Sequence, residues 1–163
     1  MAIAEPAFFT LKLCTALGCG LVAGTFLAFS TFVMKALGQQ PPAQGIATMQ
    51  SINITVINPW FMGTLFGTAG GCLALVVASF LQEFQPDTPY VLLGSAVYLL
   101  GTILVTIAAN VPLNNALAAV PPDSPASHGL WAKYLRNWTR WNHLRMVAAL
   151  VAATLLTLAI GSS

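Results

Sequence analysis

Residues 60–81, WFMGTLFGTAGGCLALVVASFL, contain no charged side chain and decide the fold. At a rise of about 1.5 Å per residue, a helix of this length crosses a hydrocarbon core roughly 30 Å thick. Similar apolar runs cover residues 8–32, 90–109 and about 140–160. We therefore predict an all-α protein, a four-transmembrane-helix bundle, in which residues 1–163 form one integral membrane domain. Lys12, near the start of the first run, is expected to snorkel to the interface.

Composition excludes a soluble fold, because 57% of the residues are hydrophobic and 6% are charged, against roughly 25% charged in ordinary soluble domains. A net charge of +2 is also too small to indicate a nucleic-acid partner. The expected surroundings are therefore membrane lipid.

The charges are distributed unevenly along the chain. Two connections are flanked by basic side chains, namely Lys35, Lys133, Arg136, Arg140 and Arg145. Glu5, Glu83 and Asp87 share the opposite side with Lys12. The positive-inside rule then places both termini outside and the two long connections in the cytoplasm. We expect a multi-pass protein of a bacterial inner membrane.

Helix boundaries are marked by proline and asparagine. Asn58 is suited to cap the second helix, with Pro59 at its first position. Pro112 is expected to stop or kink the third helix. The run 146–160 is too short to span alone, so the fourth helix is expected to begin within residues 131–145. Residues 38–45 are predicted to form a turn, and 46–57 a short interfacial segment.

Glycines recur at four-residue spacing in the first two spans. They are Gly20 and Gly24 in the first span, and Gly63, Gly67 and Gly71 in the second. Ridges of small residues permit close contact between helix backbones, so we predict tight packing of these two helices. Such ridges also serve contacts between chains, which leaves a homo-oligomer open.

Polar residues cluster at three places on the side of the long connections. They are Asn53 with Asn58, Asn110 with Asn114, and the stretch 141–145, WNHLR. Polar groups at membrane depth usually line a cavity or pair with one another. At about 100° per residue, one helix face carries Tyr134, Trp138, Trp141, Asn142 and Arg145, whereas His143 points away from Arg145.

Two interpretations of this face compete. In the first interpretation, Trp and Tyr side chains hold a flat aromatic substrate, and Asn and Arg donate hydrogen bonds to its oxygens. In the second interpretation, the face is an aromatic belt at the membrane interface with a snorkelling arginine. His143 is either a general base or a solvated interfacial histidine.

Other chemistries have less support. No metal site is predicted, because Glu83 and Asp87 lie across the membrane from His143. A copper site would have to combine histidines with methionines, drawn from His128, His143, Met34, Met49 and Met62. The spans lack the carboxylate of a proton-coupled exporter and the paired cysteines of a disulfide reductase.

Five motifs occur in order along nearly the whole chain. They are GTFLAFS at 24–30, MQSIN at 49–53, NPWFM at 58–62, NVPLN at 110–114 and WTRWNHLR at 138–145. Together they resemble the anthrone oxygenase family of four-helix membrane proteins. The members that gave the family its name oxidise polyketide anthrones to anthraquinones with molecular oxygen.

The resemblance implies oxidation of a lipophilic aromatic, anthrone-like compound, with oxygen as co-substrate and no predicted cofactor. In that hypothesis His143, Arg145 and Asn142 are catalytic: His143 takes a proton while Arg145, helped by asparagines, stabilises the enolate oxygen. Substrate-binding residues would be Asn53, Asn58, Trp60, Asn110, Asn114, Trp138 and Trp141. The alternative is a non-catalytic membrane protein that binds a lipid, a quinone or a partner helix.

Overall fold

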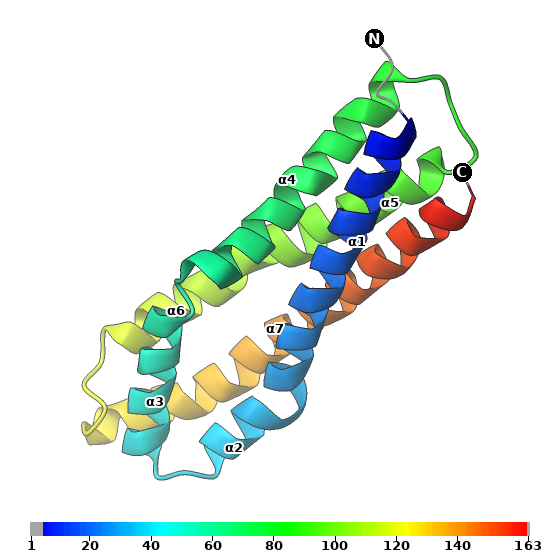
Figure 1. The fold of residues 1–163 in the computed structure, drawn as a ribbon. Helices are drawn as coiled ribbons and strands as arrows, with labels where there is room; N and C mark the ends of the chain where they lie inside the picture. The colour runs from blue at the N-terminus through cyan, green and yellow to red at the C-terminus, as the bar shows by residue number, and fades with distance from the viewer. Residues whose placement is uncertain (1–4, 163) are drawn as a thin grey trace.

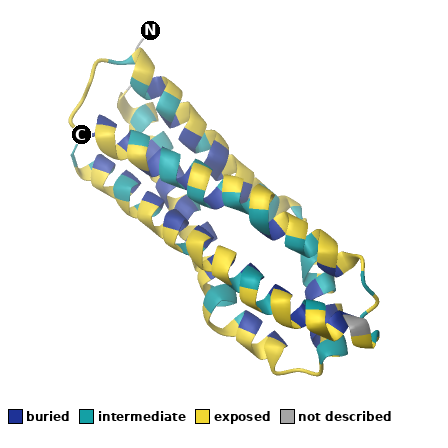
Figure 2. Cartoon of the chain, turned by 180° about the vertical axis from the view of Figure 1, so that it is seen from behind, coloured by how far each residue is buried: buried dark blue, intermediate teal, exposed yellow. Residues whose placement is uncertain are grey.

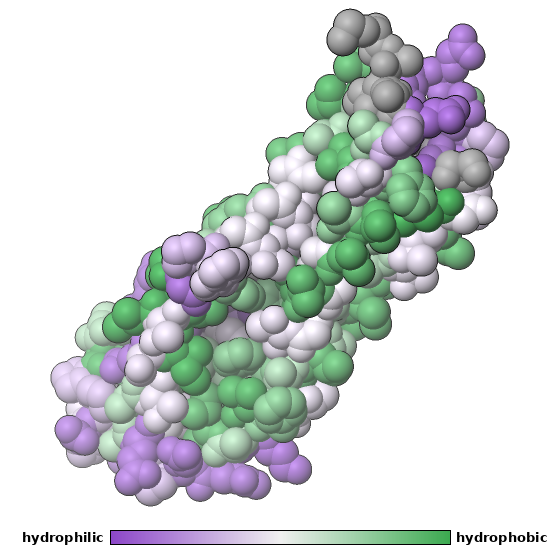
Figure 3. Space-filling model, in the orientation of Figure 1, coloured by the Kyte–Doolittle hydropathy of each residue, from purple (hydrophilic) through white to green (hydrophobic). Residues whose placement is uncertain are grey.

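The computed structural model describes residues 5–162, except the side chain of Ala126, and has the predicted all-α architecture. Four helical stretches are long and apolar enough to cross a membrane: Glu5–Gly38, Pro59–Leu81, Thr88–Ala118 and Ser127–Gly161. Figure 3 shows hydrophilic residues gathered at the two ends, with apolar surface between them. The chain is a multi-pass membrane protein built as a helical bundle.

Two of the four stretches combine several elements. The first is α1 (Glu5–Ala28), π-helix η1 (Phe29–Val33) and α2 (Met34–Gly38), and α4 (Pro59–Leu81) is the second. The third is α5 (Thr88–Tyr98), π-helices η2 (Leu99–Leu104) and η3 (Thr106–Asn110), and α6 (Val111–Ala118). The fourth is α7 (Pro125–Gly161). The shorter α3 (Pro42–Thr55) lies beside α6 and the start of α7, at the end opposite the start of α1 (Figure 1).

Two hydrophobic clusters hold the bundle together. One fills the space between α1, α4, α5 and the second half of α7. The other joins α2, α3, α6 and the first half of α7 around Met49, Trp131 and Trp138. Figure 2 shows buried faces turned inward along both halves. The second cluster explains why three of the helices run beyond the predicted spans 8–32, 90–109 and 140–160, since their flanking residues have a core of their own.

The third helix continues through Pro112, so the prediction that it could stop there is wrong. Two π-helical segments precede the proline, and the N–H of Val111 bonds to the carbonyl of Thr106. A π turn is wider than an α turn, so it relieves the clash between a proline ring and the preceding turn. The polar residues Asn110 and Asn114 thereby remain on one continuous helix.

Residues 42–55 form a packed helix rather than a mere interfacial segment. Ile46 and Met49 of α3 are buried, and Gln50 Nε2 donates to the carbonyls of Leu117 and Val120 at 2.8 and 3.0 Å. Asn58 caps α4 as predicted, because its Oδ1 accepts from two backbone N–H groups of the first turn at 3.1 and 3.0 Å. These contacts fix α3 against the membrane helices.

The glycine ridges were only partly predicted correctly. A Cβ added at Gly20, Gly24, Gly63 or Gly67 would meet nothing within 4 Å. Instead, a Cβ at Gly18 would collide with Thr68, and one at Gly71 would collide with Thr15. The helices α1 and α4 therefore meet through two reciprocal glycine–threonine contacts, and most of the predicted ridge faces outward.

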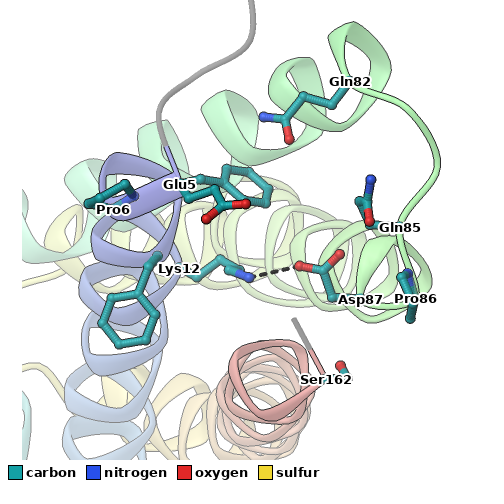
Figure 4. Close-up of a pocket in the computed structure, with 10 residues that line it drawn as sticks. Glu5, Pro6, Lys12, Gln82, Gln85, Pro86, Asp87 and Ser162 are labelled. Atoms are coloured by element: carbon teal, nitrogen blue, oxygen red, sulfur yellow. Dashed lines mark hydrogen bonds and ion pairs between the residues drawn. The ribbon is translucent and has the colours of Figure 1, made fainter.

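Lys12 does not snorkel to water, contrary to the prediction. Its side chain is 2% exposed, and its Nζ lies 2.7 Å from Asp87 Oδ2. Figure 4 shows Lys12 reaching from α1 towards Asp87, directly before α5. An ion pair compensates the buried ammonium, which explains why the side chain can stay inside.

Candidate functional site

An apolar cavity of about 230 Å³ lies where α1, η1, α3, α4, η3, α6 and α7 meet. Its wall is mostly aliphatic and aromatic. The polar residues in the wall are Thr25, Asn53, Thr106, Asn114, Trp138 and Arg145. An apolar wall with a few placed polar groups is the usual composition of a small-molecule site. We call this site the Arg145 cavity.

Among residues 5–162, Arg145 is the only charged residue of the wall, and it is 5% exposed. Nη1 donates to Thr106 Oγ1 at 3.2 Å, and Nη2 donates to Asn142 Oδ1 at 2.8 Å. The guanidinium also lies over the Phe26 and Trp138 rings, 4.2 and 5.2 Å from their centroids. Its Nε is buried without a hydrogen-bond partner. All these partners are neutral, and within residues 5–162 no carboxylate pairs with Arg145.

Asn142 is fully buried, and its Oδ1 accepts a hydrogen bond from the Arg145 guanidinium. Its Nδ2 donates to the Phe26 carbonyl and to Ser30 Oγ, both at 2.8 Å. Because the same side chain accepts from Arg145, it joins α7 to α1 and η1. Asn142 does not line the cavity, so the structure gives it the place of a positioning residue.

Asn114 organises the aromatic side chains of α7. Its Oδ1 accepts from Tyr134 Oη and from Trp138 Nε1, each at 2.8 Å. These two bonds satisfy the polar ends of two buried aromatic side chains. Trp138 is thereby fixed with its ring at the cavity wall, beside Arg145.

The other two asparagines differ in their relation to the cavity. Asn53 of α3 lines it, and its Nδ2 is buried without a partner. Asn110 is 1% exposed, donates to the Trp138 carbonyl at 3.3 Å and does not line the cavity. The cavity thus has two polar groups whose hydrogen bonds are incomplete, Asn53 Nδ2 and Arg145 Nε.

A model of the anthrone oxygenase family matches residues 59–155, which is more than half of the chain. The chain belongs to the anthrone oxygenase family. The resemblance seen in the five sequence motifs is confirmed. The matched region contains Asn114, Trp138 and Arg145 of the cavity wall. No curated protein and no solved structure matches the chain.

Several residues predicted for the site of this anthrone oxygenase family member lie elsewhere. Trp60 is 88% exposed and Trp141 is 43% exposed, and neither lines the cavity. Asn58 is the cap of α4. His143 is exposed and lines a separate surface hollow together with Lys35 and Arg140. The structure therefore does not bring His143 to the Arg145 cavity.

The aromatic wall was missed by the prediction from sequence. Phe26, Phe29 and Phe61 line the cavity. A signal did exist, because Phe26 and Phe29 are three residues apart, on one side of a helix, and lie within the motif GTFLAFS. Phenylalanines are so common in lipid-facing positions that this spacing alone does not distinguish the two environments.

The residues of the copper alternative are dispersed. Met49 and Met62 line the Arg145 cavity, whereas Met34 and His143 line the separate surface hollow. Within the described part of the chain, no three His, Cys, Asp or Glu side chains are grouped as metal ligands. The residues that the structure does bring together are hydrogen-bond donors and aromatic rings.

Proposed function

We propose that this protein oxidises a lipophilic, anthrone-like aromatic compound with molecular oxygen in the Arg145 cavity. The observation that carries the proposal is a buried guanidinium with only neutral partners, facing an otherwise apolar and aromatic wall. Such a cation favours a ligand in which negative charge develops on oxygen. Membership of the anthrone oxygenase family also favours oxidation of an anthrone-like compound.

The chemistry needs little from the protein beyond charge stabilisation. An anthrone methylene, flanked by two aryl rings and conjugated with a carbonyl, loses a proton to water to give an enolate, and the peroxide anion that forms later takes a proton back from water. In the proposal, Arg145 stabilises the enolate oxygen, and the electron-rich carbon reduces oxygen and bonds to it. The resulting hydroperoxide loses water, so the methylene becomes a carbonyl and the second oxygen atom leaves as water. One anthrone and one O₂ give one anthraquinone and one water.

The cavity suits a lipophilic ligand of limited size. Its volume of about 230 Å³ lies just below the roughly 300 Å³ at which drug-sized sites begin. Its rim includes Ile57 and Phe66, which are 72% and 53% exposed on the outer surface of the bundle. Phe66 lies on the membrane helix α4 and Ile57 in the connection before it, so in the proposal this apolar rim admits a hydrophobic substrate from the bilayer.

A binding protein without turnover is the second candidate. The observation that favours it is the composition of the wall, which within residues 5–162 contains no Asp, Glu, His or Cys to act as a base. In this candidate the cavity holds a quinone or a lipid, and the same donors only recognise its oxygens. The two candidates differ in whether oxygen is consumed.

The positions of the basic residues support the membrane orientation proposed from sequence. Lys35, Lys133 and Arg136 are exposed, and all three belong to the half of the bundle built around α2, α3 and α6. Glu5 and Glu83 belong to the other half. We accordingly propose a bacterial inner membrane location with the α2 and α6 ends in the cytoplasm.

The first experiment is metal analysis of the purified protein, followed by oxygen uptake with anthrone before and after chelation. Chelator-resistant uptake is expected. Arg145→Ala should abolish it while the protein stays folded in detergent, and Arg140→Ala, the same change on the outer face of α7, should not. Uptake that persists in Arg145→Ala would contradict the proposed site. Absence of uptake in the wild type would leave the binding protein.

A further inference from the structure

Within residues 5–162, no ionised partner compensates the charge of Arg145. The guanidinium is 5% exposed, and its hydrogen bonds go to a threonine hydroxyl and an asparagine carbonyl oxygen. A buried charge that lacks an ionised partner is costly. The same molecule shows how such a cost is met, since the buried Lys12 is paired with Asp87 at 2.7 Å.

Two donor atoms of residues that line the cavity are buried and make no hydrogen bond. They are Arg145 Nε and Asn53 Nδ2. The first comes from α7 and the second from α3, and both residues line the same cavity. Buried donors without acceptors are rare in folded proteins, and where they occur they need an explanation.

Within the described residues, the cavity wall has no acidic side chain that could pair with Arg145 in place of a ligand. The cavity residues from α1, η1, α3, α4, η3 and α6 include no Asp, Glu, His, Lys or Cys within the described range. The Tyr134 hydroxyl, on the same helix as Arg145, donates to Asn114 Oδ1. The positive charge of Arg145 is therefore unopposed in the space that a ligand would occupy.

We infer that the Arg145 cavity selects its aromatic ligand as an anion, an ionised phenol or enol whose oxygen is held by the charge of Arg145, with Asn53 lining the same cavity. This inference rests on the proposed function, because it assigns the substrate class of the same cavity. Neutral aromatic hydrocarbons, ethers and ketones that cannot enolise would leave the guanidinium uncompensated. A substrate that arrives already ionised also needs no base from the protein, which agrees with the composition of the wall.

The test uses a dye that reports its own ionisation. The probe is 1,2-dihydroxyanthraquinone, which has no methylene to oxidise and changes colour when a hydroxyl ionises. Its visible spectrum is recorded with the purified wild-type protein in detergent across a pH series, beside 1,2-dimethoxyanthraquinone, which cannot ionise. We expect the bound dye to show the anion spectrum at least about one pH unit below the free dye, a tenfold preference. The dimethoxy compound should bind at least about tenfold more weakly.

Variants assign the effect to the two donors. Arg145→Gln should abolish both the spectral shift and the preference for the ionisable dye, whereas Arg140→Gln on the outer face of α7 should keep them. Asn53→Leu should weaken binding of the dye anion, and Asn115→Leu, an exposed position on α6, should not. If Arg145→Gln fails to fold, the wild-type comparison and Asn53→Leu still decide the matter.

A bound dye with the spectrum of its neutral form would overturn the inference. Equal binding of the dimethoxy compound would do the same. Oxygen uptake with anthrone is measured on the same preparation, and it tests the proposed function separately. Uptake together with a neutral bound dye would overturn anion selection alone, and anion binding without uptake would overturn the oxygenation alone.

Discussion

Arg145 donates from Nη2 to Asn142 Oδ1 at 2.8 Å, and Asn142, three residues earlier on α7, is anchored in turn to the Phe26 carbonyl of α1. The guanidinium is therefore held at two points by neutral groups and by the Phe26 ring below it. This arrangement fixes the direction of the cation without neutralising its charge. The charge remains directed at the cavity.

Replacing the amide of Asn142 by a carboxylate places a negative charge beside Arg145 and also removes the Nδ2 donor to the Phe26 carbonyl and Ser30 Oγ. In Asn142→Asp, an ion pair with Arg145 would neutralise the cavity, so turnover of anthrone is expected to fall by about 10² to 10³-fold. Affinity for the 1,2-dihydroxyanthraquinone anion should fall as well. The control is Asn137→Asp, which adds the same charge to α7 outside the cavity wall. Full activity of Asn142→Asp would show that the charge of Arg145 is not used.

Asn114 is expected to support the cavity through two aromatic partners. Asn114→Leu removes the acceptor of Tyr134 Oη and Trp138 Nε1, both from buried side chains. Each unsatisfied donor should cost about 1–3 kcal/mol of folding free energy. Thermal unfolding in detergent measures the loss, with Asn115→Leu as the exposed neighbour. Equal melting temperatures of the two variants would contradict this role.

The membrane helices were predictable because their signal is local. A run such as 60–81 has no charge, and Asn58 with Pro59 marks the start of its helix within a few residues. The continuation through Pro112 was not predictable, because it depends on π turns whose sequence has no distinctive pattern. Lys12 was misjudged for a related reason, since its partner lies 75 residues away.

The prediction of the candidate site was correct for three residues of α7 and wrong for several aromatic residues near them. Helical periodicity brought Trp138, Asn142 and Arg145 to one face, and the structure shows all three buried together. The same periodicity included Trp141, which lies at the edge of that face and is 43% exposed. An aromatic residue near a membrane boundary has the same sequence signature whether it faces lipid or a cavity, and Trp60 shows the same ambiguity.

The two glycines that do touch a neighbouring helix can be distinguished from those that do not. Gly18→Val should force Thr68 aside and separate α1 from α4, at a cost of about 1–3 kcal/mol. Gly67→Val, on the outward side of α4, meets nothing within 4 Å and should leave the melting temperature nearly unchanged. Melting curves in detergent compare the two. A larger loss for Gly67→Val would indicate that this outward ridge packs against another chain.

The Lys12–Asp87 pair should stabilise the end of the bundle opposite the Arg145 cavity. Lys12→Met leaves the Asp87 carboxylate, 3% exposed, without its cation, and breaking a buried pair in this way costs about 3–5 kcal/mol. The double variant Lys12→Met with Asp87→Asn removes both charges, so it should recover most of that loss. Unfolding in detergent measures stability, and anthrone-dependent oxygen uptake at low temperature should stay close to wild type in the double variant, since the pair does not contribute to the cavity wall. Equal destabilisation of the single and double variants would mean that Lys12 acts through packing of its aliphatic chain rather than through charge.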